Sequence, residues 1–293
     1  MKKKIGIVSC DEWKNKIKED LMLQRELLQE GYITEIISWQ DETVNYSEYE
    51  CLILRSVWGY QDHYPQFKKW LLSLKENNIP IYNNVDIILD NIRKDKQFEI
   101  LDKYSIPHIP TTFIKQSDEI KRIYEYDKKF VVKPLISGSG KNTYMITPAL
   151  KGDFPIKDTI IQSCISIVNQ EENGLMLQPF IPSIKNGEYS CIFIDGINTH
   201  NMLRFPGIFA EKKHAIYLPT IPFDVINLAN NVSQIPEFNN YLYMRIDIVV
   251  ENNMPYIMEV ELAEPDLLIK YIADENIKQN TLKTFAKKIE RRM

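Results

Sequence analysis

The sequence predicts a mixed α/β (α+β) protein in which a small parallel α/β domain precedes two α+β units. Apolar runs alternate with amphipathic helical segments as far as residue 83, a pattern typical of a parallel sheet flanked by helices. Strand-like runs joined by short loops then dominate, and residues 243–265 contain two alternating strands around a break. From these observations we expect domains at residues 1–93, 94–182 and 183–293.

The first domain consists of strands and helices in alternation. We expect strands at Ile5–Cys10, Ile33–Trp39, Cys51–Leu54 and Ile79–Asn83, and helices at Lys14–Glu30 and Tyr64–Asn77. Ligands of such sheets lie beyond the carboxyl ends of the strands, where Ser9 and the loop RSVWGY emerge. Arg55 of this loop could bind a carboxylate, and Trp58 could line a pocket. The alternative is that Arg55 pairs locally and Trp58 only packs.

The later elements follow in chain order. The middle unit is expected to contain helices at Asp95–Tyr104, Asp118–Tyr126 and Asp158–Val168, and strands at Phe130–Leu135, Tyr144–Thr147 and Leu175–Phe180. The last unit is expected to contain strands within 187–196 and 197–206, a loop, a helix near Pro222–Val232, the hairpin and two C-terminal helical stretches.

Composition argues against several classes of protein. With 293 residues, a net charge of -4 and a pI near 5.7, the chain is not expected to bind nucleic acid through a basic surface. The apolar run after Lys4 is too short for a signal peptide and no run is long enough to cross a membrane, so we expect a cytoplasmic protein without a membrane partner. The four cysteines form no CxxC pair, which argues against a zinc site or a disulfide framework. A homodimer is left open.

The segment Tyr243–Pro265 predicts a β-hairpin with an acidic face. A three-residue loop at Asn252–Met254 would pair Val249 with Ile257, Asp247 with Glu259 and Arg245 with Glu261. The other face would then carry the apolar side chains of Ile246, Ile248, Val250, Met258, Val260 and Leu262.

Three carboxylates on one hairpin face require compensation. Neighbours about 5 to 7 Å apart repel by roughly 2 to 3 kcal/mol at an effective dielectric of ~20, and Arg245 offsets only part of this. Oxygen ligands without His or Cys suit Mg²⁺, which commonly shares its coordination with substrate phosphates. The alternative is a solvated hairpin whose acids face water and pair with Arg245.

Other polar residues occur in apolar strands or glycine-containing loops. Lys133 lies in an apolar strand and suggests a bound anion, although an edge-strand lysine could also reach water. The loop SGSGKNT behind it could present backbone N–H groups to phosphates, or be a plain hairpin turn. Arg204, in a later strand, is a second candidate to bind phosphate. The proline of Gln178–Ile181 could leave neighbouring backbone groups free to bind an adenine edge. Lys96 and Glu188, taken alone, are typical of surface residues.

The order and spacing of these motifs resemble those of the ATP-grasp superfamily. The resemblance is carried by Lys96, by VVKPLISGSG, by MLQPFIPSI with GEYS, and by RID followed by EVE. LRSVWGY, DGINTHNMLRFP and MEVELAEPDL are similar to a bacterial subgroup that includes the cycloserine-forming O-ureido-serine cyclo-ligase and glutathione-synthetase-like proteins. The fold this implies has a small N-terminal α/β domain and two α+β subdomains that clasp ATP.

The resemblance also implies roles for individual residues. ATP would be bound by Lys96, Lys133, Ser137, Gly138, Ser139, Gly140, Gln178, Pro179, Phe180, Ile181 and, at the ribose, Glu188. Mg²⁺, expected as two ions and replaceable by Mn²⁺, would be bound by Asp247, Glu259 and Glu261, the last at a position where many members have Asn. Arg204 and Arg245 would stabilise the transferring group. Substrate contacts are expected from Ser9, Arg55, Trp58, Glu264 and His200, which could instead be a structural histidine.

The implied activity is that of an ADP-forming ligase. A carboxylate, on an amino acid or small peptide, would be activated as an acyl phosphate and attacked by an amine or thiol. No covalent protein nucleophile is needed, and the sequence has neither a GxSxG nor an HExxH motif. An intramolecular cyclo-ligase, a phosphotransferase and a nucleotide-binding regulator without turnover remain alternatives. The loop after Pro206 is short for the family, which leaves the substrate lid unassigned.

Overall fold

The computed structural model describes residues 3–138, 140–147, 158–205 and 214–293. Contacts divide the chain into two compact units. Unit 1 combines residues up to Asn91 with those from Ser183 onward, and unit 2 comprises Ile92–Pro182. The finer division into three domains stays a prediction. No helix among the described residues is long and apolar enough to span a membrane.

The first part of unit 1 is the predicted parallel sheet. Its strands are β1 (Lys4–Ser9), β2 (Ile33–Ser38), β3 (Cys51–Leu54) and β4 (Ile81–Tyr82), which pair in the order β2-β1-β3-β4. The helices are α1 (Lys18–Gln29), α2 (Tyr64–Glu76) and α3 (Val85–Ile92), with 3-10 turns at Tyr46–Glu48 and Tyr60–His63. Helix α3 was not predicted, although the Asn84 side chain caps it by accepting the Ile87 N–H.

The second part of unit 1 is an antiparallel sheet of five strands. They are β9 (Glu188–Ile194), β10 (Ile197–Phe205), β11 (His214–Leu218), β12 (Tyr243–Glu251) and β13 (Met254–Glu261), in the order β11-β10-β9-β12-β13. Helices α6 (Phe223–Ser233) and α7 (Glu275–Glu290) complete this part, with 3-10 turns at Pro182–Asn186, Pro236–Phe238 and Ile269–Tyr271. The sequence predicted a loop where β11 forms, because this strand is short and weakly alternating.

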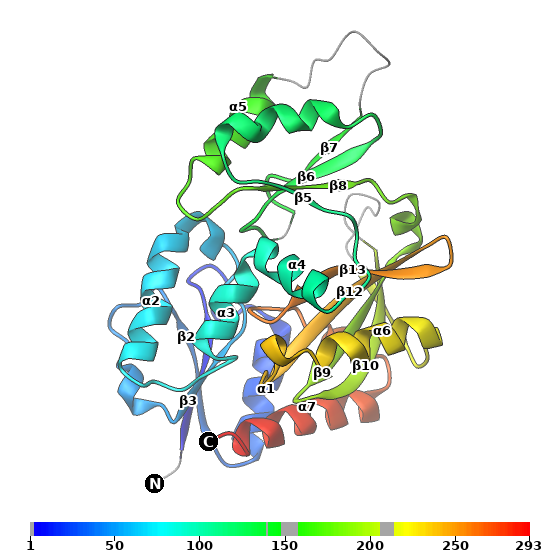
Figure 1. Ribbon diagram of the computed structural model, residues 1–293. Coiled ribbons are helices and arrows are strands. Elements are labelled where there is room, and N and C mark those ends of the chain that lie inside the picture. Colours follow the sequence, from blue (N-terminus) through cyan, green and yellow to red (C-terminus); the bar gives the residue numbers. More distant parts are fainter. Residues whose placement is uncertain (1–2, 139, 148–157, 206–213) are drawn as a thin grey trace. The chain divides into compact units, whose positions relative to one another are not determined.

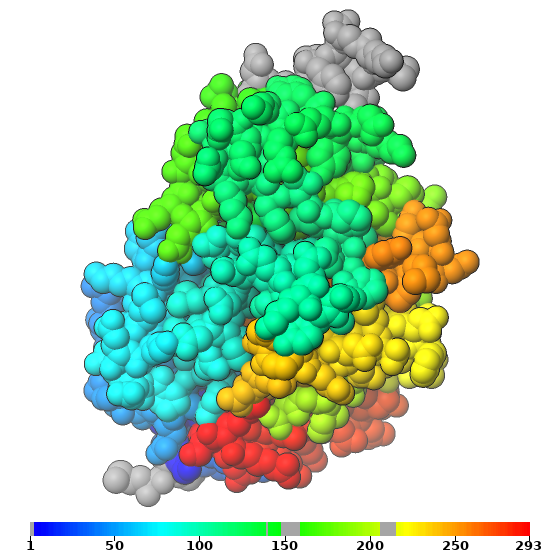
Figure 2. Space-filling model, viewed as in Figure 1, coloured from blue at the N-terminus to red at the C-terminus, as the bar shows by residue number. Residues whose placement is uncertain are grey.

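The hairpin of β12 and β13 confirms the predicted register near the acids and corrects it near the turn. Arg245 pairs with Glu261 and Asp247 with Glu259, as expected. The pairing of Val249 with Ile257 is wrong, because the register shifts after Asp247 and Val249 lies opposite Tyr256. The loop has two residues instead of three, and both are asparagines with positive φ, which matches a type I′ turn. Its tip projects at the surface (Figure 2).

One hydrophobic core joins both parts of unit 1. It contains Ile5 and Ile53 of the parallel sheet, Tyr243 of β12 and Phe285 of α7 in a single cluster. Helices α1 and α7 pack against each other within it (Figure 1). The C-terminal helix therefore anchors the antiparallel sheet to the N-terminal sheet.

Unit 2 is an antiparallel sheet with a helix packed on it. The strands are β5 (Thr112–Ile114), β6 (Phe130–Pro134), β7 (Tyr144–Ile146) and β8 (Leu175–Pro179), in the order β5-β8-β6-β7. Helix α5 (Asp158–Val168) covers this sheet, and α4 (Lys94–Lys103) begins the unit (Figure 1). The predicted helix near Asp118–Tyr126 is a 3-10 helix at Ser117–Glu125.

Candidate active site

The acidic face of the β12–β13 hairpin brings three carboxylates together. The ligand atoms of Asp247, Glu259 and Glu261 lie within 4.8 Å of one another. Asp247 and Arg245 are only 1% and 3% exposed, whereas Glu259 and Glu261 are half-buried. The pairing with Arg245 considered in the alternative is therefore present, but Asp247 does not face water. Both sides of β12 are buried here, which explains why charge on this strand needs specific partners.

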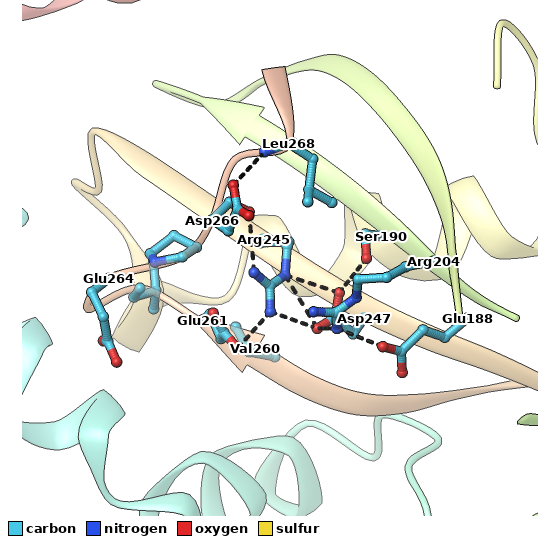
Figure 3. Close-up of polar contacts among 12 residues, drawn as sticks. Glu188, Ser190, Arg204, Arg245, Asp247, Val260, Glu261, Glu264, Asp266 and Leu268 are labelled. Atoms are coloured by element: carbon cyan, nitrogen blue, oxygen red, sulfur yellow. Dashed lines mark hydrogen bonds and ion pairs between the residues drawn. The ribbon is translucent and has the colours of Figure 1, made fainter. Parts of the chain in front are cut away.

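A chain of ion pairs connects four strands of the sheet, β10, β9, β12 and β13 (Figure 3). The Glu188 carboxylate lies 2.5 Å from the Arg204 guanidinium, which lies 2.6 Å from Asp247. Arg245 then contacts Asp247 at 3.0 Å and Glu261 at 2.5 Å. The pairing of β9 with both β10 and β12 produces this arrangement, since it aligns Arg204 with Glu188 and places β9 beside Asp247.

Burial and the arginines set the charge states in this network. Burial would raise the pKa of Asp247, but Arg204 and Arg245 outweigh it and lower the pKa, so this carboxylate is ionised. Burial raises the pKa of Glu188, partly opposed by Arg204. Burial, together with the charges of Glu259 and Asp247, raises the pKa of Glu261 to about 8 despite the contact with Arg245.

The donor set fits a divalent cation bound next to phosphate. Four carboxylates and two guanidiniums leave a formal charge of −2 when all six groups are ionised. Oxygen ligands alone suit Mg²⁺ or Mn²⁺. Within the described residues, the buried Nε of Arg204 has no hydrogen-bond partner, which leaves one N–H donor for an anionic ligand. The residues present therefore fit both the metal and the phosphate of a metal–nucleotide complex.

Glu188 occupies a different environment from the one expected. It was expected as a ribose ligand or a surface acid, and it is a buried member of the ion-pair chain. Ser190 was missed: its hydroxyl donates to Asp247 at 2.6 Å. The motif GEYS contains both Glu188 and Ser190, and strand alternation places them on one face. The sequence could therefore have predicted that Ser190 lies beside Glu188 in this network.

The predicted substrate residues of the N-terminal sheet are engaged with protein groups. Ser9 is fully buried, and its hydroxyl lies 2.7 Å from that of Ser56. Arg55 is 4% exposed, donates to the Pro265 carbonyl at 3.0 Å, and lies 3.6 and 3.7 Å from Glu19 and Asp20. This is the local pairing considered as the alternative for Arg55.

Trp58 and His200 likewise donate to backbone carbonyls. The indole N–H of Trp58 donates to Glu264 at 3.2 Å. His200 is buried, and its ring nitrogens lie 2.9 Å from the Thr199 hydroxyl and 2.7 Å from the Leu267 carbonyl. Burial lowers the pKa of His200 to about 4. The structure therefore favours the structural role of His200 over substrate contact.

Glu264 has a half-buried side chain that points away from Arg245 and Asp266 (Figure 3). Tyr60, which was not assigned a role from the sequence, is buried near Glu264. Burial, together with the charge of Glu264, raises the pKa of the Tyr60 hydroxyl. Glu264 and Tyr60 thus form a polar pair beside the metal-binding candidates.

The phosphate-binding candidates of unit 2 lie on a surface helix and in one hairpin. Lys96 lies on α4 with its side chain 47% exposed, 3.7 Å from Glu99. Lys133 is half-buried in β6, between β8 and β7 in the sheet, although beyond the last residue that pairs with β7. Ser137, Gly138 and Gly140 belong to the connection between β6 and β7, where Gly140 has a φ of 74°. Ser139 and the loop after Pro206 lie outside the described residues.

The adenine-binding candidates lie at the end of β8. Gln178 is buried, and its amide donates to the Thr111 hydroxyl at 2.9 Å. The N–H of Phe180 donates to the Lys129 carbonyl at 2.9 Å, so it is not free for an adenine edge as expected. Pro179, the last residue of β8, and Ile181 are half-buried. Lys129 lies over the Phe180 ring, 4.1 Å from its centroid.

The two units together have the fold of the ATP-grasp proteins. Residues 99–212 match the family described as prokaryotic glutathione synthetase, ATP-grasp domain. Residues 5–83 match the family described as D-cycloserine synthetase DcsG, N-terminal domain. The expected fold class and the expected resemblance are both confirmed.

More particularly, the chain is similar to cycloserine biosynthesis protein DcsG of Streptomyces lavendulae. The two sequences are 23% identical over 269 residues, which cover 83% of this chain and 85% of that protein. The crystal structure of D-cycloserine synthetase DcsG superposes with a TM-score of 0.81 at 17% identity, covering 99% of each chain. D-alanine–D-alanine ligase from Bacillus anthracis, complexed with ATP, gives 0.65 at 16% identity, again covering 99% of each chain.

Proposed function

We propose that this protein is an ATP-dependent, ADP-forming ligase that activates the carboxylate of an amino acid or small peptide as an acyl phosphate. An amine, or a thiol, of the second substrate then displaces phosphate. The observation that carries the proposal is the hairpin cluster, where three carboxylates converge within 4.8 Å beside two arginines. Phosphoryl transfer requires such positioned charge and no protein nucleophile.

Each charged residue has a proposed part in this reaction. Asp247, Glu259 and Glu261 would bind Mg²⁺, which supplies charge neutralisation at the nucleotide phosphates. Arg204, with its unpartnered Nε, would donate to an oxygen of the transferring phosphoryl group. Arg245 would hold Asp247 and Glu261 in orientation.

The nucleotide contacts keep the roles that their motifs predict. Lys96 and Lys133 would contact the phosphates, the loop Ser137–Gly140 would lie over them, and Gln178–Ile181 would bind adenine. Because the Phe180 N–H is already bonded, adenine recognition would rest on other groups of this segment. The enzyme would act in the cytoplasm, where ATP and Mg²⁺ are available.

An intramolecular cyclo-ligase is the second candidate. It is favoured by the match of residues 5–83 to the N-terminal domain of D-cycloserine synthetase, the part expected to contact substrate. The two reactions differ in stoichiometry. A cyclo-ligase consumes ATP with one substrate that contains both carboxylate and amine, whereas the intermolecular ligase needs a second molecule.

The proposal is tested by following ADP and phosphate release with Mg-ATP and a library of amino acids and dipeptides, offered singly and in pairs. Turnover that requires a pair, or that joins two molecules of one compound, supports the ligase. Turnover with a single compound whose product has the mass of one substrate molecule less one water supports the cyclo-ligase. Tight ATP binding without ADP release from any member of the library would reject both in favour of a nucleotide-binding regulator.

Glu259→Gln tests the metal assignment. Its turnover should fall about 100-fold or more, because a bound divalent ion contributes several kcal/mol to such a transition state. Glu251→Gln is the matched control, since Glu251 lies on the same hairpin outside the cluster and its amide counterpart can still accept the Ser183 N–H. Equal turnover in the Glu259 variant and the control would remove the metal assignment.

A further inference from the structure

Four consecutive backbone carbonyls after the hairpin are each held by a different side chain. They belong to the segment Glu264–Leu267, which follows β13 and contains no regular secondary structure. The four hydrogen bonds are Trp58 to Glu264 at 3.2 Å, Arg55 to Pro265 at 3.0 Å, Arg245 to Asp266 at 3.1 Å and His200 to Leu267 at 2.7 Å.

Such a segment needs these donors because its backbone is largely enclosed. Pro265, Leu267 and Leu268 are buried, and a buried carbonyl without a partner costs about 1 to 3 kcal/mol. Strand neighbours normally satisfy such groups, but the ladder of β13 ends at Glu261. The donors come from three places, namely the loop after β3, β10 and β12.

We propose that Arg55, Trp58 and His200 are positioning residues that fix the Glu264–Leu267 segment, and thereby the geometry of the metal-binding end of the hairpin. Three of the residues expected to contact substrate act on the protein backbone instead. The effect of this positioning on catalysis rests on the function proposed above. The effect of this positioning on the order of the backbone does not depend on that function.

Arg245 transmits the position of the segment to the metal ligands. The same guanidinium donates to the Asp266 carbonyl, to Asp247 and to Glu261. Glu261 itself lies three residues before the segment on a continuous chain. A displaced segment would therefore move both the guanidinium that orients the carboxylates and the end of the strand that carries Glu261.

The surroundings of His200 and Arg55 indicate that these side chains hold the Glu264–Leu267 segment and do not contact a ligand. Both ring nitrogens of His200 have protein partners, and Arg55 lies between Glu19 and Asp20 with its guanidinium 5.3 Å from the centre of the Tyr243 ring. The Tyr243 hydroxyl also lies 3.1 Å from the Ala263 carbonyl, although the Leu54 carbonyl is its nearest acceptor.

The test compares His200→Gln with His200→Asn. A glutamine amide can place its N–H near the position of the imidazole Nε2, whereas asparagine is too short to reach the Leu267 carbonyl. Amide hydrogen exchange of peptides covering residues 262–270 measures the order of the segment, and Mn²⁺ binding followed by electron paramagnetic resonance measures the metal site without turnover. His108→Gln is the control, because that histidine is in unit 2.

We expect His200→Asn to accelerate exchange in this segment about 10-fold, as one lost hydrogen bond predicts, and to weaken Mn²⁺ binding several-fold. His200→Gln should restore both to near the wild-type values. Trp58→Phe, which removes one donor from a half-buried site, should loosen the segment even if the histidine variants fold poorly.

Two results would overturn the inference. One is wild-type exchange and Mn²⁺ binding in both His200→Asn and Trp58→Phe. The other is a glutamine variant with a protected segment but no turnover, which would show that His200 acts on the substrate. Absence of turnover in the wild type would count against the proposed ligase and would leave the exchange experiment decisive for the segment.

Discussion

Asn83 connects the N-terminal sheet to the β12–β13 hairpin, and its removal should destabilise unit 1 severely. The side chain is fully buried. Its amide donates to the carbonyls of Tyr243 and Leu262 at 2.9 and 2.6 Å, and its oxygen accepts the Leu242 N–H at 2.6 Å. Asn83→Ala would leave three buried backbone groups without this partner, at about 1 to 3 kcal/mol each, so we expect a loss of about 3 to 9 kcal/mol.

Urea unfolding followed by tryptophan fluorescence measures this loss selectively. All four tryptophans, from Trp13 to Trp70, lie in unit 1, so the signal reports on that unit. Asn280→Ala is the control, because Asn280 is exposed within α7 and its replacement should change stability by less than about 0.7 kcal/mol. A loss below about 1 kcal/mol in Asn83→Ala would refute the reasoning, since the backbone groups would then have found other partners.

Three further predictions concern pH, the turn and the metal. Folding lowers the pKa of His200 from its usual 6.5 to about 4, so below pH 6.5 the unfolded state binds a proton that the folded state does not. The free energy of unfolding of unit 1 should therefore fall by roughly 3 kcal/mol between pH 6.5 and 4. Urea titrations at each pH measure this loss, and His200→Gln should not show it. Asn253→Val should cost roughly 1 to 2 kcal/mol in thermal unfolding, because φ is 62° there, whereas Asn253→Gly should be tolerated; equal melting temperatures would argue against the type I′ turn. Mn²⁺ at 100 times its dissociation constant should stabilise the wild type by about 2.7 kcal/mol, and it should stabilise the Glu261→Gln variant less. Equal stabilisation of the two proteins would show that Glu261 does not bind the ion.

The sequence was sufficient for features governed by local pattern. The alternation of β12 and β13 predicted the pairs Arg245–Glu261 and Asp247–Glu259, and the apolar run Cys51–Leu54 predicted a buried parallel strand. A one-residue slip would have turned the acids to the other face, so the pattern left little freedom at that end of the hairpin. At the turn, the predicted loop of Asn252–Met254 was one residue too long, because Met254 already belongs to β13, and the predicted register there was wrong.

Partners contributed by distant strands were not predictable in the same way. Arg55, Trp58 and His200 could be recognised as polar side chains in apolar surroundings, but their carbonyl acceptors lie far along the chain, up to 210 residues away for Arg55. Periodicity carries no information about such contacts. A polar residue in an apolar run therefore predicts that a partner exists, and only the fold shows whether that partner is a ligand or the backbone.

The ion-pair chain itself argues for a ligand. A buried salt bridge is weak evidence for stability, and replacing one with apolar side chains of similar volume is often neutral or stabilising by about 1 to 4 kcal/mol. Here the network also contains more carboxylates than guanidiniums, and burial raises the pKa values of Glu188 and Glu261. In addition, one N–H of Arg204 has no hydrogen-bond partner among the described residues. Packing alone would favour valine or isoleucine at these strand positions. A divalent cation and a phosphate, which we propose as the ligands of this site, would offset that cost, and we infer that the charges are arranged for this bound state rather than for the unliganded fold.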